Sequence, residues 1–143
     1  MSKPAAYLLE PDRYPMRSEI ELRYSDLDVN RHLNNVALVD ILQEARGRYH
    51  RESGMVKASD AFTLMVANLS VQFLGEAFYG GPITCYTGVR ALGRTSQTVA
   101  QLALQGDRQV AYAETVMVTM MDGKPTPHPA DYREKMMPWL IQQ

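Results

Sequence analysis

Hydrophobic and polar residues alternate over several short segments of this chain, a pattern typical of β-strands with one buried face. In residues 18–24, Ile20, Leu22 and Tyr24 alternate with charged neighbours. Further β-rich segments follow at residues 66–74, 83–92, 96–104 and 109–121. Glycine-containing turns separate several of these segments, and strands joined by short turns are expected to be antiparallel neighbours.

One segment instead repeats its apolar residues at the spacing of a helix. These positions are Leu38, Leu42, Ala45 and Tyr49. The polar residues between them fall mostly on the opposite face, so residues 36–49 predict an amphipathic helix. Gly54 is expected to end it, because glycine adopts the left-handed conformation common after a helix.

The remaining segments are expected to be less regular. Residues 1–15 contain three prolines and predict an irregular arm, and residues 55–60 predict a loop. Asp122-Gly123 should end the sheet. Residues 131–137 predict a short helix that Pro138 would end.

The order β-α-β-β-β-β predicts an α+β fold in which one long helix packs against a curved antiparallel sheet of about five strands. Residues 1–143 show no repeat or compositional boundary, so a single domain is expected. Long strands with few prolines or lysines leave backbone groups unpaired at the sheet edges. We therefore expect a homodimer or a dimer of dimers.

Charge and composition narrow the classes of function. The net charge is −1 and no stretch of basic residues is present, so a nucleic-acid partner is not expected. No secretory signal or segment of ~20 apolar residues is recognisable, which predicts a cytoplasmic protein without a membrane span. Cys85 is the single cysteine, so we expect neither a disulfide nor a cysteine-bound zinc, and interpret Cys85 as a core residue.

The stretch from Asp26 to Asn35 is the most unusual part of the chain. It holds two aspartates, three asparagines, an arginine and a histidine, more polar groups than a plain connector needs. It directly precedes the predicted helix, where Asn34 is a good candidate for the N-cap. We interpret this stretch as the chemical site. No second histidine cluster accompanies it, so neither a metal nor another cofactor is expected.

The segment Asp26-Leu27-Asp28-Val29-Asn30-Arg31-His32-Leu33-Asn34-Asn35-Val36 resembles that of hotdog-fold acyl-thioester hydrolases of the 4-hydroxybenzoyl-CoA thioesterase type. It is closer still to the corresponding segment of acyl-carrier-protein thioesterases. The strand order fits the hotdog fold, and the likeness covers residues 18–130. Two positions depart from the family pattern: Arg31, where a glycine is frequent, and Leu38, where a tyrosine is frequent.

The resemblance implies an enzyme that hydrolyses an acyl-CoA or acyl-carrier-protein thioester in a cleft between subunits. Asp28 would be the catalytic carboxylate, as general base or nucleophile, and the backbone N–H of Asn35 would polarise the carbonyl. Asn30 and His32 would be supporting catalytic residues, and Asn34 would be a substrate-binding residue at the start of the helix. Substrate contacts with the CoA phosphates are implied for Arg90, Arg94 and Ser96.

Simpler roles remain open for most of these residues. Asp28 could be only a turn residue, and His32 could only order the loop. Asp26 is more readily interpreted as structural, paired with Arg23 or Arg31. His50 and His128 are expected at the surface. The polar side of the second strand could face either the shared cleft or solvent; its residues are Asn68, Ser70 and Gln72.

Two other functions are compatible with the motif. A hotdog enoyl-thioester hydratase or dehydratase carries a related aspartate–asparagine–histidine pattern, but the segment here lacks its proline and is one residue shorter. A non-catalytic module that binds acyl thioesters is the other alternative.

Overall fold

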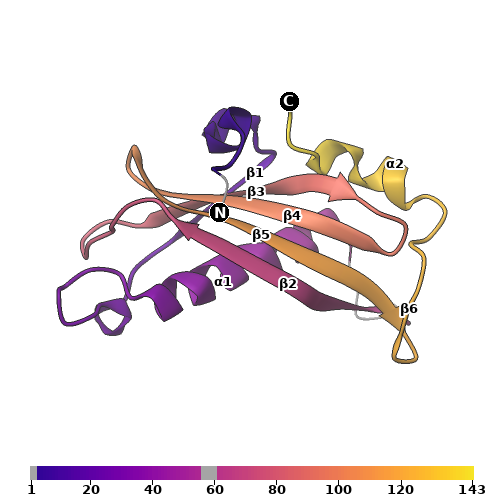
Figure 1. Ribbon diagram of the computed structural model, residues 1–143, viewed down its shortest axis with the longest axis horizontal. Coiled ribbons are helices and arrows are strands. Elements are labelled where there is room, and N and C mark those ends of the chain that lie inside the picture. Colours follow the sequence, from indigo (N-terminus) through magenta and orange to yellow (C-terminus); the bar gives the residue numbers. More distant parts are fainter. Residues whose placement is uncertain (1–2, 56–60) are drawn as a thin grey trace.

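The computed structural model describes residues 3–55 and 61–143 (Figure 1). Its five main strands form one antiparallel sheet in the order β1-β3-β4-β5-β2. Their bounds are Met16–Ile20 for β1, Thr63–Phe73 for β2, Ile83–Leu92 for β3, Ser96–Gln105 for β4 and Arg108–Met121 for β5. The helix α1, Asn35–Ser53, lies along one face of this curved sheet. The predicted α+β arrangement is therefore confirmed; of the predicted loop, residues 56–60 lie outside the described part.

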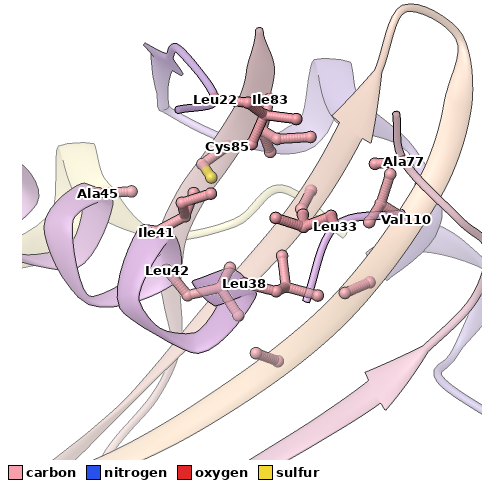
Figure 2. Close-up of a cluster of buried hydrophobic side chains, with 13 residues drawn as sticks. Leu22, Leu33, Leu38, Ile41, Leu42, Ala45, Ala77, Ile83, Cys85 and Val110 are labelled. Carbon is pink, nitrogen blue, oxygen red and sulfur yellow. The ribbon is translucent and has the colours of Figure 1, made fainter. Parts of the chain in front are cut away.

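The small side chains on the inner face of the sheet let α1 pack closely against it. Leu38, Leu42 and Ala45 of the helix meet Cys85 and neighbouring alanines of the sheet (Figure 2). Cys85 is fully buried, and burial raises the pKa of its thiol to about 12. Its prediction as a core residue is thus confirmed by its complete burial in the cluster beneath α1.

The last turn of the helix, just before Gly54, leaves His50 partly buried rather than at the surface. Gly54 ends α1 with φ 68°, as expected. His50 nevertheless donates from Nε2 to the Met117 sulfur at 2.9 Å, and burial, followed by the nearby Arg46 charge, lowers the pKa of His50 to about 4. The prediction of a surface position was wrong, because the final turn of α1 still packs over β5.

Strand β2 does not lie where short connections alone predicted. β3, β4 and β5 are sequential neighbours, but β2 pairs with β5 rather than with β3. The connection across residues 74–82 is long enough to carry the chain to the opposite edge. β2 is consequently an edge strand, with β5 on one side and no other strand of the described chain beside it.

Two strand ends also differ from the prediction. β1 ends at Ile20, and Tyr24 is 79% exposed instead of continuing the buried side of a strand. At the other end, Asp122 and Gly123 do not end the sheet, because both have positive φ and reverse the chain into β6, Lys124–Pro125. Positive φ at both central residues is the geometry of a two-residue hairpin turn.

Both terminal arms pack against the sheet. The proline-rich N-terminal arm is more regular than expected, with 3-10 helices at Ala6–Leu9 and Pro11–Arg13. The predicted C-terminal helix is present as α2, Tyr132–Met136, and a 3-10 turn at Met137–Trp139 follows it. The arms converge on Gly88 of β3, where a Cβ atom would lie 2.7 Å from both Ile141 and Pro15.

We predict that Gly88→Ala destabilises the fold by about 1–3 kcal/mol, because the added methyl group overpacks this contact. Gly47→Ala is the matched control, since nothing lies within 4 Å of a Cβ there and alanine favours the helix by about 0.5–1 kcal/mol. Urea denaturation of both variants measures the difference. A Gly88→Ala variant as stable as the wild type would contradict the described convergence of the arms.

Candidate active site

The start of α1 is fixed by an asparagine cap. The backbone N–H of Val36 donates to Asn34 Oδ1 at 2.8 Å, and Leu38 N–H donates to the Asn34 carbonyl at 2.9 Å. Asn35 is the first residue of the helix, so its N–H has no acceptor within the helix. The predicted cap is confirmed, and it leaves an oriented N–H at the positive end of the helix dipole.

Asp26 holds the loop that leads into the helix. Its carboxylate accepts from Arg23 N–H at 2.8 Å and from Arg23 Nη2 at 2.9 Å, while its carbonyl accepts from Asn34 N–H at 2.8 Å. The hydrogen bond from the Arg23 side chain holds the pKa of Asp26 below its usual value. Asp26 is therefore structural, as interpreted from the sequence, and its partner is Arg23.

Asp28 organises the tip of the same loop while its side chain stays exposed. Asp28 Oδ1 accepts from the N–H groups of Asn30 at 2.8 Å and His32 at 3.2 Å. Its own N–H donates to the His32 carbonyl at 2.8 Å. Within the described chain Oδ2 makes no hydrogen bond. One carboxylate oxygen thus shapes the turn, and the other is available to a ligand.

His32 lies against a segment that no sequence pattern connects with it. Its Nδ1 is 3.2 Å from Glu76 Oε1, and its ring meets Phe78 edge-on, with 5.0 Å between the ring centroids. Leu33 N–H donates to the Ala77 carbonyl at 2.8 Å and fixes this approach. Glu76 was missed because it lies in the distant connection after β2, and no local pattern marks it.

These groups share one pocket of about 450 Å³. Its polar lining residues are Asp28, Asn30, His32, Asn35 and Glu76. Apolar walls come from α1, from the end of β2 and from β5, through Leu38, Phe73 and Val110. A carboxylate, a helix N-terminus and an imidazole therefore meet beside an apolar surface, which is a combination suited to acyl transfer.

The three predicted phosphate contacts lie elsewhere in the chain. Arg90 donates to Glu114 Oε1 at 2.9 Å, and both line a separate pocket of about 300 Å³ together with Ser70 and Gln72. Arg94 lies in the turn between β3 and β4, and Ser96 begins β4. None of the three lines the pocket of Asp28.

His128 anchors the C-terminal arm beside this turn and is not a free surface residue, contrary to the expectation. Its Nε2 donates to the Ser96 carbonyl at 2.9 Å, and its Nδ1 lies 2.9 Å from the Thr119 hydroxyl. The ring also stacks on Tyr132, with centroids 3.8 Å apart. The structure thus assigns His128 a packing role.

Two kinds of feature are absent from the described residues. No group of three or more histidine, cysteine, aspartate or glutamate side chains is placed to hold a metal ion among them. No helix in residues 3–55 and 61–143 combines the length and apolar character of a membrane-crossing segment.

The chain belongs to the thioesterase-like superfamily, whose sequence model matches residues 22–140. A thioesterase from Thermus thermophilus, crystallised with coenzyme A and zinc, is 26% identical with a TM-score of 0.76, over 87% of this chain and 93% of that one. A predicted thioesterase from Bacillus stearothermophilus has a TM-score of 0.81 at 24% identity, over 90% and 98% of the two chains. The probable thioesterase YbaW from Escherichia coli has a TM-score of 0.73 at 21% identity, over 87% and 98%.

The fold shared with these structures is the hotdog fold, in which a curved antiparallel sheet wraps one long helix. The expected fold and family are thereby confirmed. Among curated proteins, no match to the chain was found.

Proposed function

We propose that this protein hydrolyses the thioester bond of an acyl-CoA or an acyl-carrier protein. The observation that carries the proposal is the meeting of Asp28 and the free N–H of Asn35 in one pocket of a thioesterase-like chain. The structural relative from Thermus thermophilus was crystallised with coenzyme A, which supports a CoA-type substrate.

In this proposal the thioester carbonyl accepts a hydrogen bond from Asn35 N–H, which stabilises negative charge as it develops on the oxygen. Asp28 either removes a proton from water as the water attacks the carbonyl carbon, or attacks that carbon itself. In the second route, water then hydrolyses the mixed anhydride. The C–S bond breaks in both routes, and the products are the free acid and the thiol.

His32 is proposed to move a proton during this reaction, with Glu76 as its positioning residue. If Nδ1 donates to the Glu76 carboxylate, Nε2 remains free to exchange a proton with the departing sulfur or with water. Asn30 lines the same pocket and is proposed to contact the substrate through its amide. Asn34 contributes indirectly by holding the start of the helix.

A second copy of the chain is proposed to complete the site. Four large apolar side chains of the edge strand β2 are 39–53% exposed: Met65, Val66, Leu69 and Phe73. Antiparallel pairing of two β2 strands would cover them and satisfy the unpaired edge. The end of β2 lies at the Asp28 pocket. Ser96 lies at the opposite end of β2, because it pairs with Val118, which in turn pairs with Met65 near the start of β2. Such pairing would therefore bring the turn between β3 and β4 of the partner to the pocket of this chain. Arg94 and Ser96, which lie at that turn, are kept as proposed substrate contacts.

Arg90 is also retained as a proposed phosphate contact, although its guanidinium forms an ion pair with Glu114 in the single chain. A dimer of dimers and a cytoplasmic location likewise remain predictions.

We predict that Asp28→Asn lowers kcat for thioester hydrolysis by about 10²-fold to 10⁴-fold, the usual contribution of a general base. Asparagine retains an oxygen that can accept the two backbone hydrogen bonds, so the fold should be preserved. Thiol release from a panel of acyl-CoAs measures the rate, and Asp40→Asn on the exposed side of α1 is the control. Water addition to an enoyl-CoA without thiol release would instead indicate a hydratase, and binding without reaction would indicate a binding module.

We predict that Glu76→Ala lowers kcat by roughly threefold to tenfold, a modest effect because the Glu76 side chain is 63% exposed. If Glu76 acts only through His32, adding Glu76→Ala to His32→Ala should produce no further loss. A double-mutant cycle of kcat values tests this coupling. Losses that multiply in the double variant would refute the positioning role.

We predict that the 16.1 kDa chain sediments as a dimer or larger assembly and that Leu69→Lys shifts it toward the monomer. A charge placed on the apolar edge strand would have to be desolvated in the interface. Met137→Lys is the matched control, because Met137 is 60% exposed on the C-terminal arm. A wild-type protein that sediments as a monomer would rule out the proposed shared site.

A further inference from the structure

Arg31 has an unusual backbone conformation at the tip of the Asp28 loop. Its φ is 64°, and the only other non-glycine residue with positive φ in the described chain is Asp122. A side chain with a Cβ atom is disfavoured there, and aspartate tolerates the conformation better than arginine. The turn holds Arg31 in place because its N–H donates to the Asp28 carbonyl at 3.0 Å.

The guanidinium of Arg31 is available to a ligand. Its side chain is exposed, and no hydrogen bond or ion pair joins it to any residue of the described chain. Other arginines near the ends of the sheet are already engaged: Arg23 with Asp26, and Arg90 with Glu114. An unpaired cation is thus carried by the same loop as Asp28.

A second arginine, Arg108, contacts the segment that forms one side of the pocket. Arg108 Nη1 donates to the Glu76 carbonyl at 3.2 Å, and its guanidinium carbon is 4.9 Å from the centroid of the Phe78 ring. Phe78 in turn contacts His32, the neighbour of Arg31. Figure 1 places the start of β5 and the loop before α1 at the same end of the molecule. We call Arg31, His32, Phe78 and Arg108 the cationic rim.

The signs of charge differ between the rim and the pocket. The pocket itself contains the carboxylates of Asp28 and Glu76, which oppose entry of an anion. The rim carries two guanidinium groups, which pair well with phosphate oxygens. A ligand with a phosphate and an uncharged arm would therefore keep its phosphate at the rim and insert the arm.

We propose that Arg31 and Arg108 bind the 4′-phosphate of a phosphopantetheine thioester at the mouth of the pocket. This inference rests on the proposed function. Phosphopantetheine is common to CoA and to carrier proteins, and its pantetheine portion is an uncharged amide arm that ends in the sulfur. The rim thus selects for the phosphorylated arm and directs the thioester toward Asp28.

The test compares kcat/KM for one acyl group carried on pantetheine, phosphopantetheine, CoA and a carrier protein. Arg31→Gln should lower kcat/KM about tenfold more for the three phosphorylated carriers than for pantetheine. Arg31→Lys should recover part of this difference, because it retains the positive charge, and Arg108→Gln should reproduce the difference. Arg51→Gln, at the far end of α1, is the control and should not alter the ratio. The difference should shrink as salt concentration rises.

Each remaining outcome contradicts the proposal. An equal loss of kcat/KM with all four carriers would mean that Arg31 only shapes the loop. An unchanged kcat/KM with every carrier would mean that Arg31 does not contact the phosphate. Sensitivity confined to acyl-CoA would assign Arg31 to a phosphate of the nucleotide instead.

A failure of the proposed hydrolysis can be recognised separately. If the wild-type protein cleaves none of the four carriers, calorimetric binding of CoA and pantetheine to the wild type and Arg31→Gln decides the matter. Weaker binding of CoA alone in the variant would support the cationic rim. Equal binding in both proteins, or no binding of CoA to the wild type, would overturn it.

Discussion

The packing of α1 on the inner face of the sheet is the contact on which the rest of the structure depends. Small residues such as Cys85 and Ala103 leave room for the larger helix residues, so one continuous core joins the two layers. This contact fixes the helix direction and brings its N-terminus to the end of the sheet where β2 finishes. Asp28, His32 and Asn35 line the pocket because they lie on the helix start or on the loop that leads into it.

The site combines rigid support with exposed chemistry. Asp26 and Asn34 use their hydrogen bonds to hold the loop and the helix start, and both are engaged within the chain. Asp28 uses one oxygen for the turn and leaves the other accessible. A preorganised N–H beside a carboxylate of this kind suits a reaction in which negative charge develops on a carbonyl oxygen. The open edge of β2 indicates why the proposed substrate contacts extend to a second copy.

Local sequence patterns predicted those elements whose structure depends on residues close together in the chain. The helix, its cap at Asn34 and its end at Gly54 all follow from residues close in sequence. The strand predicted to reach Tyr24 is shorter, because Tyr24–Asp26 form a 3-10 turn that is closed by the interaction of Arg23 with Asp26. The surface position expected for His50 was wrong because its ring meets Met117 of β5, a residue far from it in the sequence.

The sequence by itself determined the long helix, the five main strands and, through the motif around Asp28, the family. These depend on periodicity and on residues that are adjacent in the chain. Only the tertiary structure decided that β2 pairs with β5, that Glu76 meets His32 and that Arg108 packs on the ring of Phe78. These contacts join distant segments, and their partners are set by how the sheet curves around α1. No local pattern of residues encodes that geometry.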